Sequence, residues 1–151
     1  MSASPAQCTS PWTLLRGFVV RGRAEPIGEW SDETERQFRI AWGLAGTMAA
    51  RYAEEGFVVA IDDVAPPRAV EVYRRSVGER PVRRVLLAPS LDVALERNAR
   101  QRGKPFDTAA LVATIRELQT TLVPDPAGWV VLDSSRLSVT ETVDVILEAF
   151  R

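Results

Sequence analysis

The segment RVLLAPSLDVALERNARQRG (84–103) joins a strand pattern to a helix pattern. Its apolar beginning, within 82–88, predicts a buried strand. Ser90 is placed to cap a helix that ends near Arg100, and a basic turn follows at 101–106. A strand that leads directly into a helix is the basic unit of an α/β protein.

Two further apolar runs have the same character. FVVAI (57–61) is followed by two aspartates, and WVVLD (129–133) is followed by two serines. Uninterrupted apolar runs of this length are typical of strands that are buried on both faces. The segment 12–20 is compatible with either a strand or a helix. Helices are expected around these runs at 32–56, 66–76, 107–122 and 138–150.

Strands that alternate with helices predict an α/β fold, with a parallel sheet between two layers of helices. The chain has 151 residues, of which 46% are apolar and 26% charged, as in ordinary globular proteins. We expect a disordered N-terminus at 1–11 and a single domain at 12–151.

Composition also excludes several classes of function. The sequence contains no histidine, and Cys8 is its one cysteine, which excludes Ser/His and Cys/His catalysis, thiolate zinc sites and an internal disulfide. A net charge of -1 gives no general attraction to nucleic acid or to an anionic membrane. No apolar run approaches the ~20 residues of a membrane span, and no signal pattern opens the chain, so we expect a cytoplasmic protein.

Four segments in series resemble the P-loop small-molecule kinases of the chloramphenicol phosphotransferase-like and zeta-toxin-like AAA-type group. They are RGRAEP (21–26), AEEGFVVAIDDV (53–64), the stretch 84–103 and VVLDSSRLSVTETVDVIL (130–147). The resemblance covers about residues 14–150. It implies a P-loop kinase-like fold, ATP and Mg²⁺ as cofactors, and transfer of the γ-phosphoryl group to the hydroxyl of a small-molecule acceptor.

The sequence lacks the phosphate loop of that family. The family begins with a strand and G-x-x-x-x-G-K-[ST], whose backbone amides and lysine hold the phosphates. Here the only lysine is Lys104, followed by Pro105, while Gly43 and Gly46 fall within a helical pattern. The carboxylate that activates the acceptor is also missing, because its neighbourhood reads SPWTLLRG (10–17). We therefore expect an α/β fold without the first strand and phosphate loop, and no measurable ATP turnover.

Two origins would explain the missing phosphate loop. The chain could be a truncated or frame-disrupted kinase, or it could be a stand-alone degenerate relative. The lost strand is central in the family, and each buried backbone group left unpaired costs about 1–3 kcal/mol. We therefore expect compensation. Residues 12–20 could pair into the sheet, 57–61 and 82–88 could become neighbours, or another chain could cover the gap in a homodimer.

The resemblance implies catalytic roles for Asp62 and Asp63, with Asp62 as the Mg²⁺ ligand, because they follow a strand of the Walker B kind. Ligands of α/β proteins bind at the carboxyl ends of strands, which agrees with this assignment. The structural alternative is a solvated turn in which Asp63 caps the next helix.

The resemblance also implies a lid at about 97–107 whose arginines, Arg97, Arg100 and Arg102, clamp phosphate oxygens. A guanidinium suits this task because it forms planar bidentate bonds and keeps its charge. The alternative is a basic helix C-terminus that favours the helix dipole.

Two loops complete the implied site. Ser134 and Ser135 follow the last strand, in a loop that approaches adenine in the family, although serines also suit an ordinary strand-to-helix loop. Arg21 and Arg23 would border the acceptor substrate, or form ion pairs with Glu25 or Glu29. Two functions remain: a phosphotransferase-family domain, and a non-catalytic relative that binds a nucleotide, a partner or another copy of itself.

Overall fold

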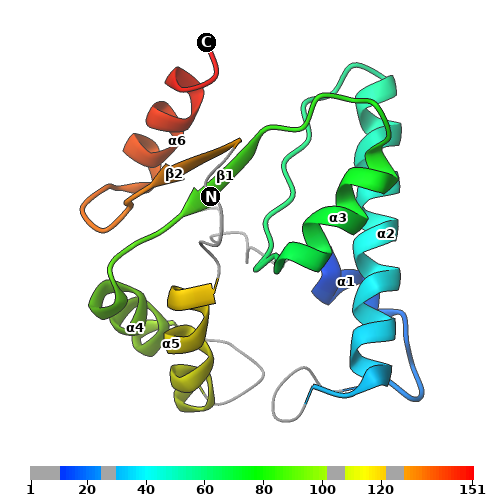
Figure 1. Cartoon of the computed structure of the whole chain (residues 1–151), viewed down its shortest axis with the longest axis horizontal. Coiled ribbons are helices and arrows are strands. Elements are labelled where there is room, and N and C mark those ends of the chain that lie inside the picture. Colours follow the sequence, from blue (N-terminus) through cyan, green and yellow to red (C-terminus); the bar gives the residue numbers. More distant parts are fainter. Residues whose placement is uncertain (1–10, 25–29, 102–107, 122–127) are drawn as a thin grey trace, which may run out of the picture. The chain divides into compact units, whose positions relative to one another are not determined.

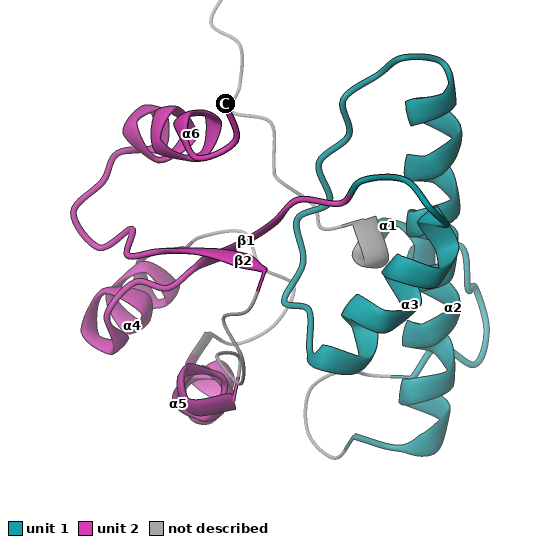
Figure 2. Cartoon of the chain, turned by 45° about the horizontal axis from the view of Figure 1, so that its top comes forward, with its two compact units in different colours: residues 1–81 teal, residues 82–151 magenta. Residues whose placement is uncertain are grey.

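The computed structural model describes residues 11–24, 30–101, 108–121 and 128–151. The chain forms two compact units, residues 1–81 and residues 82–151, which Figure 2 shows in separate colours. Unit 1 contains the helices α1 (Pro11–Gly17), α2 (Asp32–Glu54) and α3 (Pro67–Val77) (Figure 1). Unit 2 contains β1 (Arg84–Leu87), α4 (Leu91–Arg100), the 3-10 helix η1 (Thr108–Leu111), α5 (Val112–Thr121), β2 (Trp129–Leu132) and α6 (Val139–Glu148). Within the described ranges, no helix is both long and apolar enough to cross a membrane.

Unit 1 is built on the contact between α2 and α3. The α2 helix begins after Ser31, whose hydroxyl oxygen accepts a hydrogen bond from the backbone N–H of Thr34 at 3.1 Å. One face of α2 is buried, and Phe38 and Trp42 on this face pack with Ala69 of α3 to form the core. The α1 helix joins them through the buried Arg16, whose guanidinium lies 4.4 Å from the Phe38 ring centroid.

The helices α2 and α3 approach closely at a glycine. A Cβ atom added at Gly46 would lie 2.7 Å from the Cβ of Ser76, whereas one at Gly43 would lie 3.9 Å from its nearest neighbours. The missing side chain of Gly46 therefore sets the spacing between the two helices.

Unit 2 contains a parallel pair of strands. Arg84 lies opposite Trp129 and Leu87 opposite Leu132, and the backbone N–H of Ala88 extends the ladder to the carbonyl of Leu132 at 2.8 Å. The α6 helix lies on one side of the strands, and α4 and α5 lie on the other, in both Figure 1 and Figure 2. This mixed arrangement with a parallel sheet confirms the α/β class.

The strand predicted at 57–61 is wrong. This segment belongs to an irregular stretch that follows α2, and the sheet of the described residues has two strands, not three. Its apolar composition does not make a strand because a strand also needs a neighbour, and none of the described residues pairs with 58–61. Pairing of 12–20 into the sheet is also wrong, because α1 occupies most of that segment.

Candidate functional site

The strand-end cluster consists of Ser90, Arg97, Asp133, Ser134 and Ser135, which meet where β1 and β2 end. Because the two strands are parallel, their carboxyl ends lie at the same edge of the sheet. The backbone N–H of Ser90, after β1, donates to the Ser135 hydroxyl, after β2, at 2.8 Å. This bond ties the two loops together.

Arg97 of α4 holds the loop after β2. Its Nη2 donates to the backbone carbonyl of Ser134 at 2.7 Å, and its Nη1 lies 3.4 Å from the Ser134 hydroxyl. Ser134 is only 4% exposed, so a charged donor here satisfies a buried carbonyl. Arg97 is therefore already engaged in fixing the geometry of the cluster.

Asp133 supplies the negative charge of the cluster. Its Oδ1 accepts hydrogen bonds from both the hydroxyl and the backbone N–H of Ser135, the latter at 2.9 Å. These two bonds, with smaller contributions from the charges of Arg136 and Arg97, lower the pKa of Asp133 from its ordinary value. The carboxylate is therefore ionised at neutral pH.

A cavity of about 190 Å³ lies beside the cluster. Its wall is mostly apolar and comes from β1 and its following loop (Leu86, Leu87, Ala88, Pro89), from α4 (Ala94) and from α5 (Ile115, Leu118, Gln119). Gln119 is the polar group of the wall, and its Nε2 donates to the carbonyl of Pro89 at 2.7 Å. The α4 helix supplies Ala94 to the cavity and Arg97 to the cluster, so one helix joins the two.

The structure brings together three of the five residues expected at the cofactor site: Arg97, Ser134 and Ser135. Arg100, one turn along α4, instead forms an exposed ion pair with Glu96 at 2.5 Å. Arg102 and most of the expected lid lie outside the described residues.

Sequence reasoning missed Gln119 and Asp133 as members of this region. The sequence did contain an indication of Asp133, because this aspartate follows an apolar run just as Asp62 does. No sequence pattern indicated Gln119, because it reaches the cavity only through the packing of α5.

The two aspartates after residue 61 lie in unit 1, in the irregular stretch before α3. The Asp63 carboxylate accepts a hydrogen bond from the Tyr73 hydroxyl of α3 at 2.8 Å. Burial, and then the charge of Asp63, raise the pKa of Tyr73 above its ordinary value. Asp62 belongs to no group of three or more metal-capable side chains, and none occurs within the described ranges.

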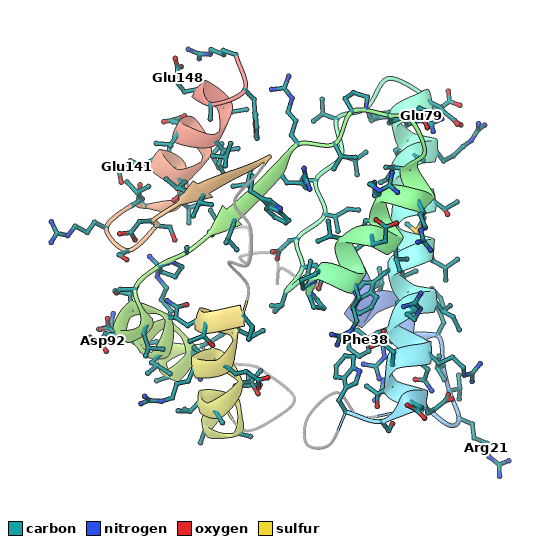
Figure 3. The ribbon with its side chains drawn as sticks, in the orientation of Figure 1. Arg21, Phe38, Glu79, Asp92, Glu141 and Glu148 are labelled. Atoms are coloured by element: carbon teal, nitrogen blue, oxygen red, sulfur yellow. The ribbon has the colours of Figure 1, made fainter. Side chains whose placement is uncertain are left out.

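Arg21 and Arg23 are exposed in the loop after α1, and the Arg21 side chain extends away from unit 1 (Figure 3). The buried Gln37 of α2 fixes this loop. Its Nε2 donates to the carbonyl of Gly22 at 2.8 Å, and its Oε1 accepts from the backbone N–H of Ala24 at 3.0 Å. The glutamates expected as their alternative partners, Glu25 and Glu29, lie outside the described residues, so both the ion pairs and the substrate role of these arginines stay predictions.

The charged side chains of the strand-end cluster are Arg97, whose guanidinium donates to Ser134, and the ionised Asp133. The expected binding of ATP and Mg²⁺ stays a prediction, because Arg102 and most of the lid lie outside the described residues. The region also offers a small apolar cavity with one amide in its wall. Comparisons of this chain with protein-family models, curated proteins and solved structures find no match.

Proposed function

We propose that this chain is a non-catalytic relative of the P-loop kinases whose unit 2 binds the ring of a nucleoside-type ligand. The observation that carries this proposal is the apolar cavity beside the strand-end cluster. It lies at the carboxyl end of β1, where α/β proteins bind their ligands. The ancestral fold in this proposal is the three-layer kinase fold, without its first strand.

The size and chemistry of the cavity favour one flat ring. This cavity is partly open to solvent, and its volume of about 190 Å³ leaves room for one flat ring, since an enclosed apolar cavity of about 150 Å³ holds a benzene molecule. Gln119 presents amide groups, which can recognise a ring edge that both donates and accepts hydrogen bonds. A nucleobase has this combination of an apolar face and a polar edge.

Two features argue against phosphoryl transfer. The sequence has no glycine-rich phosphate loop with a lysine, which supplies most of the phosphate binding in P-loop kinases. The candidate catalytic carboxylate Asp63 is hydrogen-bonded to Tyr73, and the segment before it is not a strand. Binding without catalysis therefore accounts for both the cavity and the missing phosphate loop.

Calorimetric titration of the full chain with adenosine, guanosine and ATP tests this proposal. We expect adenosine and ATP to bind with similar affinity, with or without Mg²⁺, because the phosphates find no cradle. Leu118→Trp, which fills the cavity, should abolish binding. Leu147→Trp is the matched control, because Leu147 is an exposed leucine of α6 that does not line the cavity.

A coupled assay for ADP release tests the second half of the proposal. We expect no turnover with ATP and Mg²⁺. Binding of ATP that is much tighter than binding of adenosine and depends on Mg²⁺ would contradict the proposal. A turnover rate that disappears in Asp62→Asn would contradict the proposal and establish phosphotransferase activity.

A further inference from the structure

The wall of the cavity beside the strand-end cluster carries a single polar side chain among the described residues. Of the eight residues that line the cavity, seven have apolar side chains, and the eighth is Gln119 of α5. A ring that binds here makes apolar contacts over its faces, and Gln119 is the side chain with which its polar edge can form hydrogen bonds. The kind of ring that binds should therefore depend on what this amide recognises.

The amide of Gln119 is held in one orientation. Its Nε2 donates to the carbonyl oxygen of Pro89 at 2.7 Å. A carbonyl oxygen only accepts hydrogen bonds, so the amide nitrogen has to face it, because the opposite orientation would bring two acceptors together. Pro89 also lines the cavity, so this bond fixes the amide against the cavity wall.

The Oε1 atom of Gln119 keeps its capacity to accept hydrogen bonds. Within the described part of the chain, the bond from Nε2 to Pro89 is the only hydrogen bond of this side chain, and no described residue donates to Oε1. An amide oxygen has two lone pairs, and the amide nitrogen has a second hydrogen. The amide therefore offers a ligand an acceptor with a donor beside it.

A ring edge that complements this amide carries a donor beside an acceptor. An exocyclic amine next to a ring nitrogen has this arrangement, and glutamine binds such an edge of adenine through two hydrogen bonds. A ring of the same size without the amine would cover Oε1 and supply no donor to it. Because a polar atom that loses water and gains no partner costs free energy, such a ring should bind more weakly.

We propose that Gln119 is the specificity-determining residue of the cavity and selects an aminated heteroaromatic ring, in which an exocyclic amine adjoins a ring nitrogen. This inference rests on the proposed function, because it requires that the cavity binds a ring. It adds which ring is preferred and which side chain causes the preference. Since the cavity is partly open to solvent, the amine replaces water at Oε1, and the preference should be moderate.

Calorimetric titration of the full chain with adenosine and with purine riboside, the same nucleoside without its amine, tests the inference. We expect adenosine to bind about three- to tenfold more tightly. Gln119→Met keeps the length of the side chain but removes its polar atoms, so it should bind both nucleosides with similar affinity. Gln101→Met is the matched control and should keep the full preference, because Gln101 is an exposed glutamine that does not line the cavity.

The ratio of the two affinities separates recognition of the amine from a merely structural role. If Gln119 only shaped the wall, Gln119→Met would weaken both nucleosides equally and leave the preference unchanged, which would overturn the inference. Equal binding of the two nucleosides by the unmodified chain would also overturn it, while the ring site itself would stand. If neither nucleoside binds, the proposed function fails, and this inference fails with it.

Discussion

The two units differ in what is buried inside them. In unit 1 the buried apolar residues come from α2 and α3 and surround Phe38 and Trp42. In unit 2 the buried residues within the described ranges are polar, Asn98 and Ser134, and α5 and α6 contribute none. A parallel sheet normally has both faces covered by helices, so the side chains on both faces of its strands are buried.

The two units therefore depend on different interactions. Apolar burial stabilises unit 1, at about 25 cal/mol for each Å² of apolar surface removed from water. Unit 2 relies more on directed polar contacts, such as the bond from Arg97 to the carbonyl of Ser134. Substitutions in the two units should therefore differ in size.

The largest effect is expected in the core of unit 1. Trp42→Ala removes a side chain that is 1% exposed and should lower the free energy of unfolding by about 3–5 kcal/mol. Ile40→Ala on the exposed side of the same helix should change it by no more than about 0.5 kcal/mol. Urea unfolding followed by circular dichroism measures both. Similar losses of unfolding free energy in the two variants would contradict a core packed around Trp42.

The next effect concerns the spacing of α2 and α3. Gly46→Ala should destabilise unit 1 by about 1–3 kcal/mol, because the new methyl group meets Ser76 at 2.7 Å. Gly43→Ala should instead stabilise it by about 0.5–1 kcal/mol, since its methyl group has room and alanine favours a helix. Thermal unfolding of the two variants should shift in opposite directions. A stabilising Gly46→Ala would show that the helices are not in close contact there.

A smaller effect is expected for the polar contacts of unit 2. Arg97→Ala should cost about 1–2 kcal/mol, because the buried carbonyl of Ser134 loses its donor. Arg100→Ala should cost about 0–0.5 kcal/mol, since its ion pair with Glu96 is exposed. Hydrogen exchange of the amides after β2 reports on both variants. If the two cost the same, the strand-end cluster does not hold this loop.

The smallest effect should appear only in alkaline solution. In the unfolded chain Tyr73 ionises near pH 10, whereas burial and Asp63 keep it protonated to higher pH in the folded chain. Stability should be unaffected below that pH and fall as the pH rises above it. Tyr73→Phe should reduce this fall, while Tyr52→Phe, an exposed tyrosine, serves as the control. An unchanged alkaline fall in Tyr73→Phe would contradict the contact with Asp63.

The sequence predicted correctly those features that depend only on residues close together in the chain. A helix at 138–150 was predicted, and the capping box of Ser138 and Glu141 is present at the start of α6, a feature that needs only residues three apart. The strands β1 and β2 were also predicted from their apolar runs. The run at 57–61 reads the same way but forms no strand, because strand formation depends on a neighbour that the run itself does not specify.

The candidate site was only partly predictable for the same reason. Arg97 and Ser134 are 37 residues apart, and a family resemblance, not a local motif, grouped them. The cavity could not be predicted, because Gln119 reaches it only when α5 packs beside α4 and the end of β1.

Hydrogen exchange of every backbone amide in the full chain, at a concentration that keeps it monomeric, compares the two units most directly. The slowest amides should lie in α2, around the buried Trp42, and those of β1 and β2 should exchange markedly faster. Strand amides protected as strongly as those of α2 would contradict the account, because they would show that the sheet of unit 2 already has a closed core.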